Sequence, residues 1–306
     1  VSAPLDASAG VKSVTLTDAA TGIPVPCQWD EALLTWIERG LERRATRTYI
    51  ATVSAEAQTA PGGEGVKLAQ SGDGRLDVSI GGDLFTSYHY GSEWHRPYFH
   101  PVNGPYGDPV TRAYPMVEGV AGETSDHPHH RGVWVAHGAV NSVDNWSEGE
   151  GRGKTVHREF TVLEDGPVFG HAIALSDWVK PDGRGVLLSE KRDMRFYDVG
   201  PSRLVDIDLT LTALEEDVLF GDTKEGGILS LRVASSMDVL RGGRLVSSSG
   251  AVNEAEVWGK RAHWCDYSGP VNTRRVGVAC FDHPKSFRHP TYWHARDYGL
   301  LTANPF

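Results

Sequence analysis

Alternation of apolar and polar residues with a period of two dominates this 306-residue sequence and limits what it can fold into. Residues 205–211 carry Val, Ile or Leu at every second position, with Asp and Thr between them, which is typical of a strand buried on one face. Residues 76–80 alternate in the same way, and 228–233 and 276–281 are further expected strands. One segment, Asp30 to Arg44, is predicted as a helix, although Gly40 interrupts it. The sequence therefore predicts an all-β protein, a mostly antiparallel β-sandwich.

Glycine and proline separate these segments. The chain has 35 Gly and 17 Pro, gathered in short clusters such as Gly72-Asp73-Gly74, and such clusters mark turns between short strands. The stretch from Thr59 to Gly65 is the expected boundary between two parts. Residues 1–62 are predicted to form a small N-terminal β subdomain, and residues 63–306 the main β-sandwich domain.

Charge and composition argue against several classes of protein. The formal net charge of −10 disfavours a nucleic-acid partner. No run approaches the roughly 20 apolar residues that cross a bilayer, so no membrane partner is expected. The glycine patterns contain neither a dinucleotide fingerprint nor a P-loop, so no nucleotide cofactor is expected. Three cysteines without paired spacing favour a cytoplasmic location, although a signal peptide trimmed ahead of Val1 stays open.

The centre of the chain is rich in histidine. Eight of the 13 histidines lie between residues 88 and 157, and the densest block is residues 126–132. Pro128 favours an extended His127, so His127 and His129 are expected on one face and His130 on the other. If the strand continues, His137 shares the side of His129.

Two chemistries fit this block. Neutral imidazoles of His127, His129 and His137, completed by a carboxylate from Glu123, Asp126 or Asp144, would hold one divalent metal ion. Alternatively, histidines beside acids serve as a general acid–base set near pH 7. The catalytic candidates for the second chemistry are His127, His129, His130, His137 and Glu225. A structural role, with ring N–H groups bonded to backbone carbonyls, is the alternative for each single histidine.

Aromatic and planar polar residues around the histidines are what a sugar site requires, because rings stack on the apolar face of a pyranose and polar groups bind its hydroxyls. The candidate substrate-binding residues are Arg112, Arg131, Asn141, Trp146, Lys224, Arg232, Tyr292 and His294. An ordinary polar loop with core tryptophans is the competing interpretation.

Several of these segments together resemble a known bacterial family. They are Arg112 with Pro115, residues 126–134, 137–141, 222–226, 264–269 and 289–294. In these motifs the chain looks like proteins labelled "methane oxygenase PmoA", over nearly its whole length. A subunit of particulate methane monooxygenase would cross a membrane, and this sequence has no run of apolar residues long enough to do so. We therefore treat the label as a misnomer. The resemblance implies a carbohydrate setting and a galactose-mutarotase-like supersandwich, in which a concave sheet face carries His and Glu as acid and base.

The leading hypothesis is a carbohydrate-active enzyme of epimerase, mutarotase or lyase type. It would act on a sugar or keto-sugar glycoside, with or without the help of a metal ion. In it, a histidine or Glu225 removes a proton, and Arg112 or Arg131 stabilises the developing oxyanion. One alternative is a histidine-ligated metal oxygenase or hydrolase with a cupin-like barrel, and another is a non-catalytic carbohydrate-binding protein. The expected partner is a small carbohydrate, and a homo-oligomer stays open.

Overall fold

The computed structural model describes residues 1–5, 10–30, 32–57 and 64–306, and its architecture is all-β. The predicted fold class, a mostly antiparallel β-sandwich, is confirmed, because every strand pairing is antiparallel and a large sheet packs against smaller ones. In the described part of the chain, no helix has the length and apolar character needed to cross a bilayer.

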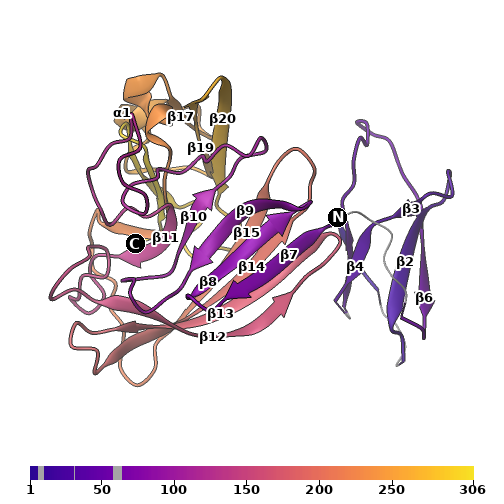
Figure 1. Ribbon diagram of the computed structural model, residues 1–306, viewed down its shortest axis with the longest axis horizontal. Coiled ribbons are helices and arrows are strands. Elements are labelled where there is room, and N and C mark those ends of the chain that lie inside the picture. Colours follow the sequence, from indigo (N-terminus) through magenta and orange to yellow (C-terminus); the bar gives the residue numbers. More distant parts are fainter. Residues whose placement is uncertain (6–9, 31, 58–63) are drawn as a thin grey trace.

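A nine-stranded sheet forms the centre of the molecule (Figure 1). It is open, with β18 and β7 at its edges. In spatial order its strands are β18 (Lys260–Arg261), β21 (Tyr292–Arg296), β22 (Leu300–Asn304), β16 (Gly226–Arg232), β11 (Val133–His137), β10 (Tyr98–Val102), β9 (Asp83–His89), β8 (Arg75–Ile80) and β7 (Val66–Ser71).

A four-stranded sheet covers one half of this sheet. Its strands, in order, are β12 (Lys154–Glu164), β13 (Phe169–Val179), β14 (Val186–Tyr197) and β15 (Leu204–Thr212). Alternate residues of β13 and β14, such as Ala172 and Met194, pack against Leu76 and Val78 of β8 in a common buried cluster. The predicted strands at 76–80 and 205–211 are thus confirmed as β8 and β15.

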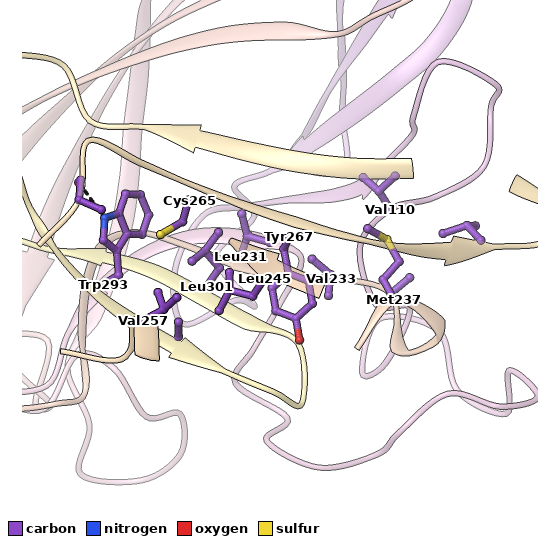
Figure 2. Packing of buried hydrophobic residues seen from close by; sticks show 14 residues of the cluster. Val110, Leu231, Val233, Met237, Leu245, Val257, Cys265, Tyr267, Trp293 and Leu301 are labelled. Carbon is purple, nitrogen blue, oxygen red and sulfur yellow. Dashed lines mark hydrogen bonds between the residues drawn. The ribbon is translucent and has the colours of Figure 1, made fainter. Parts of the chain in front are cut away.

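A three-stranded sheet covers the other half of the same face. It consists of β17 (Arg244–Ser247), β19 (Trp264–Val271) and β20 (Arg274–Phe281), with the short helices η1 (Ser235–Met237), η2 (Val239–Arg241) and α1 (Asn253–Val257) beside it. Figure 2 shows Trp293, Leu301 and Leu231 of the large sheet among the buried side chains. They pack against Cys265 and Tyr267 of β19. Both smaller sheets therefore pack on the same face of the large sheet.

The N-terminal strands form two small sheets with a core of their own, at one end of the molecule (Figure 1). They are β1 (Ser2–Pro4), β5 (Leu33–Trp36) and β4 (Cys27–Trp29) in one sheet, and β3 (Pro24–Val25), β2 (Ser13–Asp18) and β6 (Tyr49–Ser54) in the other. The expected domain boundary at residue 62 falls on residues 58–63, which lie outside the described residues.

The predicted helix from Asp30 to Arg44 is wrong. Its centre is strand β5, which pairs with β1 and β4 and buries Leu34 and Trp36. The Asp30 carboxylate accepts the backbone N–H of Leu33 at 2.8 Å, in a turn rather than a helix cap. Tertiary pairing on both edges of this short segment overrides its helical pattern.

Candidate functional site

The face of the large sheet that points away from the two smaller sheets carries a row of buried polar and aromatic side chains. Residues directly opposite one another on antiparallel strands share a face, and the register runs without interruption through Tyr98, Trp134, Ser230, Thr302 and His294. The neighbouring row, which includes Leu231, Leu301 and Ala295, faces the core. The alternation of these strands thus separates a core face from a candidate site face.

The predicted extended conformation of the histidine block is wrong, because His127 to His130 form a turn. The His130 N–H donates to the carbonyl of His127 at 3.0 Å, and His127 has a φ of 44°. Proline disfavours the right-handed helical region for the residue before it but leaves the left-handed region open. Arg112 Nη2 fixes the turn by donating to the His127 carbonyl at 2.9 Å.

The turn stacks two histidines in one column instead of placing them on opposite faces. The His127 ring stacks on both His130 and Tyr298, with ring centroids 4.8 and 5.0 Å away, and the rings of His130 and Tyr298 lie 6.5 Å apart. His130 in turn stacks on Trp134 at 5.1 Å. His130 is buried, whereas the side chain of His127 is 41% exposed. His127 is therefore the member of the column that a ligand can reach.

Asp126 holds His127 and two buried arginines together. Its Oδ2 accepts a hydrogen bond from His127 Nδ1 at 2.7 Å. Arg112 Nη1 donates to Oδ1 at 2.5 Å, and Arg232 Nη2 donates to Oδ1 at 2.8 Å. Burial raises the pKa of the Asp126 carboxyl, but the charge of Arg232 and hydrogen bonds from His127 and Arg232 outweigh it, so this pKa lies well below its ordinary value. Asp126 therefore stays ionised and fixes the orientation of His127.

The two arginines act inside the protein. Arg112 and Arg232 are 0% and 1% exposed, and Arg112 also donates to the Tyr114 carbonyl. Both were expected to bind substrate, and the structure places their guanidinium groups away from solvent, bonded to Asp126. They are positioning residues for Asp126 and the histidine turn.

Several imidazoles of the site are held neutral. Arg232 Nη1 donates to His130 Nδ1 at 3.1 Å, which leaves the His130 proton on Nε2. Burial lowers the pKa of His130 far below its usual value, and burial with the charge of Arg96 lowers that of His129 to about 4. Arg296 Nε donates to His294 Nε2 at 3.2 Å, and burial lowers the pKa of His294 to about 4.

Arg131 and Trp146 line the walls of the cluster. Glu148 accepts Arg131 Nε at 3.0 Å and Nη2 at 2.9 Å, and the guanidinium lies over the rings of Trp94 and Tyr98. Trp146 is buried, and its ring contacts those of His129, His130, Trp134 and His294. Both residues lie beside the histidines, but Arg131 is paired with Glu148 and the ring of Trp146 is buried.

Two other candidates lie outside the cluster. Asn141 bonds the neighbouring backbone, accepting the Leu219 N–H at 2.7 Å and donating to the Asp217 carbonyl at 3.2 Å. The ring of His137 contacts Phe220 and Phe306, and its Nε2 is 3.0 Å from the Gly221 carbonyl. This is the backbone-bonded role that the competing interpretation expected.

The metal set of His127, His129 and His137 is not assembled. His127 and His129 have ring centroids 5.8 Å apart, but His137 belongs to the contacts with Phe220 and Phe306. Across residues 1–5, 10–30, 32–57 and 64–306, no group of three or more His, Cys, Asp or Glu side chains is arranged to hold a metal ion.

The remaining candidates lie at a pocket of about 330 Å³ beside β21. Lys224, Tyr292 and His294 line it, together with Trp258. Glu225 follows Lys224, and its Oε1 lies 3.6 Å from Lys224 Nζ. Burial raises the pKa of the Tyr298 hydroxyl, and the charges that act on that hydroxyl include those of both Glu225 and Asp126. The Tyr298 ring itself stacks on His127, and its centroid lies 4.6 Å from the Cζ atom of Arg232, so it belongs to the surroundings of the Asp126–His127 pair.

A family model for a family of unknown function, DUF6807, matches residues 75–306. The chain belongs to this family. The match begins at the first residue of β8 and contains every residue of the candidate site, whereas the N-terminal strands precede it. No curated protein and no solved structure matches the chain.

Sequence reasoning missed three residues of this DUF6807 site. Asp126 was considered as a metal ligand, not as the partner of two arginines that lie far away in sequence. Tyr298 lies in a C-terminal stretch rich in aromatic residues, and that composition marks the stretch as a candidate. It does not predict that Tyr298 stacks on His127. Trp258 gave no sequence signal, since it follows the short helix α1 in an otherwise polar segment.

Proposed function

We propose that this protein is a carbohydrate-active enzyme in which the Asp126–His127 pair moves protons on a sugar or keto-sugar glycoside. The reaction is of epimerase, mutarotase or lyase type. The observation that carries the proposal is an exposed imidazole bonded to a carboxylate that two buried arginines hold in place. Such preorganisation is what acid–base catalysis requires and what a solvated surface histidine lacks.

His127 is the proton-transferring group of the proposal. Its Nδ1 donates to Asp126, so in the neutral ring Nε2 is the nitrogen with a free lone pair. That lone pair accepts a proton from a sugar hydroxyl, or from a carbon next to a carbonyl, and the carboxylate stabilises the imidazolium that results. The proton then returns to the substrate at the same or another atom. Glu225, whose Oε1 lies 3.6 Å from Lys224 Nζ, is proposed as the second acid–base group.

The aromatic surroundings support a sugar over other substrates. The Tyr298 ring stacks on His127 and is partly exposed, and aromatic faces pack on the C–H face of a pyranose. The large sheet, on one face of which two smaller sheets pack, also supports the mutarotase-like supersandwich implied by the sequence resemblance. The open sheet, with edges at β7 and β18, does not support the cupin-like alternative.

Exchange measurements by NMR test the proposal. A panel of aldoses, keto-sugars and glycosides is incubated with the protein in D2O, and two rates are read: anomer interconversion and replacement of carbon-bound hydrogen by deuterium. We expect acceleration of at least one, and a loss of about 10²- to 10⁴-fold in His127→Asn. Asn tolerates the left-handed conformation of residue 127 and keeps a donor for Asp126, but it lacks the titratable nitrogen.

His171→Asn is the matched control, because His171 Nε2 lies 2.8 Å from Asp193 in a second Asp–His pair on β13 and β14. This variant should exchange hydrogen at the wild-type rate. An unchanged rate in His127→Asn would contradict the assignment of His127. Sugar binding without exchange on any substrate would favour the non-catalytic carbohydrate-binding alternative.

A further inference from the structure

The pocket beside β21 displays two large aromatic side chains to solvent. Trp258 is 44% exposed and Tyr292 is 41% exposed, and both line the pocket. By contrast, Trp134, Trp146 and Trp293 are each 1% exposed. Exposed aromatic rings that line one concave surface are typical of a binding site.

Arginines hold both rings in place from one side. The Cζ atom of Arg296 lies 5.3 Å from the centroid of Trp258, and that of Arg261 lies 4.7 Å from the centroid of Tyr292. Arg296 is itself fixed, since its Nη1 donates to Glu254 at 2.6 Å. Each ring therefore keeps one face for a ligand, and its orientation is set before a ligand arrives.

Charge at the pocket favours a neutral, hydroxyl-rich ligand. Lys224 lies beside Glu225, Arg296 is paired with Glu254, and Asp222 adds another carboxylate to the lining. Lys224 and Arg296 each have an acidic neighbour, and the carboxylate of Asp222 offsets the charge of Arg261. The pocket therefore lacks the excess positive charge that a phosphate or a uronate requires. Ammonium and carboxylate groups beside aromatic rings suit the hydroxyls and C–H faces of a sugar.

The pocket and the Asp126–His127 pair lie on the same face of the sheet but at different strands. The His127 column stands on Trp134 of β11, whereas His294 at the pocket lies on β21. The strand order β11-β16-β22-β21 places the backbones of Trp134 and His294 three strand spacings apart, or about 14 Å at ~4.8 Å each. Tyr298, which stacks on His127, lies in the turn that joins β21 to β22. One pyranose ring is too short to touch both ends, and two linked rings span them.

We propose that this pocket is a second sugar-binding subsite, in which Trp258 and Tyr292 receive a neutral sugar ring linked to the ring that reacts at His127. The substrate is therefore a neutral glycoside of at least two rings rather than a free monosaccharide. This inference rests on the proposed function for the reacting end, but the subsite itself is a claim about binding.

Affinities for matched sugars test the subsite. Glucose and galactose are compared with maltose, cellobiose and lactose by saturation-transfer NMR titration of the wild-type protein, Trp258→Ala and Phe281→Ala. Phe281 is a solvent-exposed aromatic residue on β20, and it is not among the residues that line the pocket. We expect at least one disaccharide to bind more tightly than its monosaccharide. Trp258→Ala should lower that ratio about fivefold to tenfold, as the loss of one aromatic stack implies, and Phe281→Ala should leave it unchanged.

The outcomes separate this inference from the proposed function. A disaccharide preference that depends on Trp258, without hydrogen exchange on any sugar, supports the subsite and contradicts the enzyme. Hydrogen exchange at His127 with an unchanged ratio in Trp258→Ala supports the enzyme and overturns the subsite. The absence of any disaccharide preference in the wild-type protein also overturns it.

Discussion

Replacing Asp126 by Asn tests the arrangement of the two arginines on which the site depends. The substitution keeps the shape of the side chain but removes the charge that Arg112 and Arg232 share. Both guanidinium groups are at most 1% exposed, so the variant leaves two buried cations without their anion. Removing one partner of a buried ion pair costs about 3–5 kcal/mol.

The expected loss is somewhat smaller here, because the Asp126 side chain is 39% exposed and water screens part of its charge. We therefore expect Asp126→Asn to lower the free energy of unfolding by about 2–3 kcal/mol, measured by urea denaturation at pH 7. Asp193→Asn, which breaks the Asp193–His171 pair, should cost at most about 1 kcal/mol.

A double-mutant cycle sharpens this prediction. Adding Arg232→Met to Asp126→Asn removes one of the two buried cations that lack an anion. The double variant should therefore be more stable, by about 1–3 kcal/mol, than the sum of the two single losses predicts. Strict additivity, or a loss in Asp126→Asn no larger than in Asp193→Asn, would refute the claim that Asp126 neutralises a buried arginine pair.

Two further predictions concern stability. Gly132 has a φ of 53°, and a Cβ there would overlap the carbonyl oxygen of Phe99, so thermal or urea unfolding of Gly132→Ala should show a loss of about 3 kcal/mol or more. Gly107→Ala, with a φ of 82° and open space around it, should lose only about 1 kcal/mol, and equal losses would contradict the steric reasoning. Burial lowers the pKa of His129 and of His294 to about 4. Below pH ~6.5, these two histidines therefore bind protons in the unfolded chain while they stay neutral in the folded protein. The free energy of unfolding should therefore fall as the pH drops from about 6.5 towards 4, by up to about 1.4 kcal/mol per pH unit for each histidine, and a profile that stays flat over this range would contradict the burial of neutral imidazoles.

The strands that were predictable from sequence are those with strict alternation. Residues 205–211 form part of β15, and 76–80 are part of β8, because one face of each strand is buried and the other is solvated. The segment at Leu33–Trp36 was mistaken for a helix, since its apolar residues lie next to one another and its two partner strands are distant in sequence. Local patterns carry no information about such partners.

The site was predictable in composition but not in geometry. The histidine block was predicted as a candidate site. Its turn, however, depends on a hydrogen bond from Arg112 to the carbonyl of His127, and the ionised state of Asp126 depends on Arg232, which is 106 residues away in sequence. Such long-range contacts decide which histidine is exposed and which is neutral. For the same reason, Arg112 and Arg232 were expected to bind substrate, whereas both are buried and bonded to Asp126.

Chemical rescue of His127→Gly tests the central claim, that the His127 imidazole transfers the proton, most directly. Glycine suits the left-handed backbone at this position, where φ is 44°, and the exposed site of the missing ring leaves room for free imidazole. The hydrogen-exchange rate of the variant on its best sugar is measured as a function of imidazole concentration and pH. The proposed mechanism predicts that imidazole restores a large part of the lost rate, in proportion to its unprotonated fraction when proton removal limits exchange. A variant that exchanges as fast as wild type without imidazole, or one that imidazole never rescues although it folds and binds the sugar, would contradict the proton-transfer role of His127.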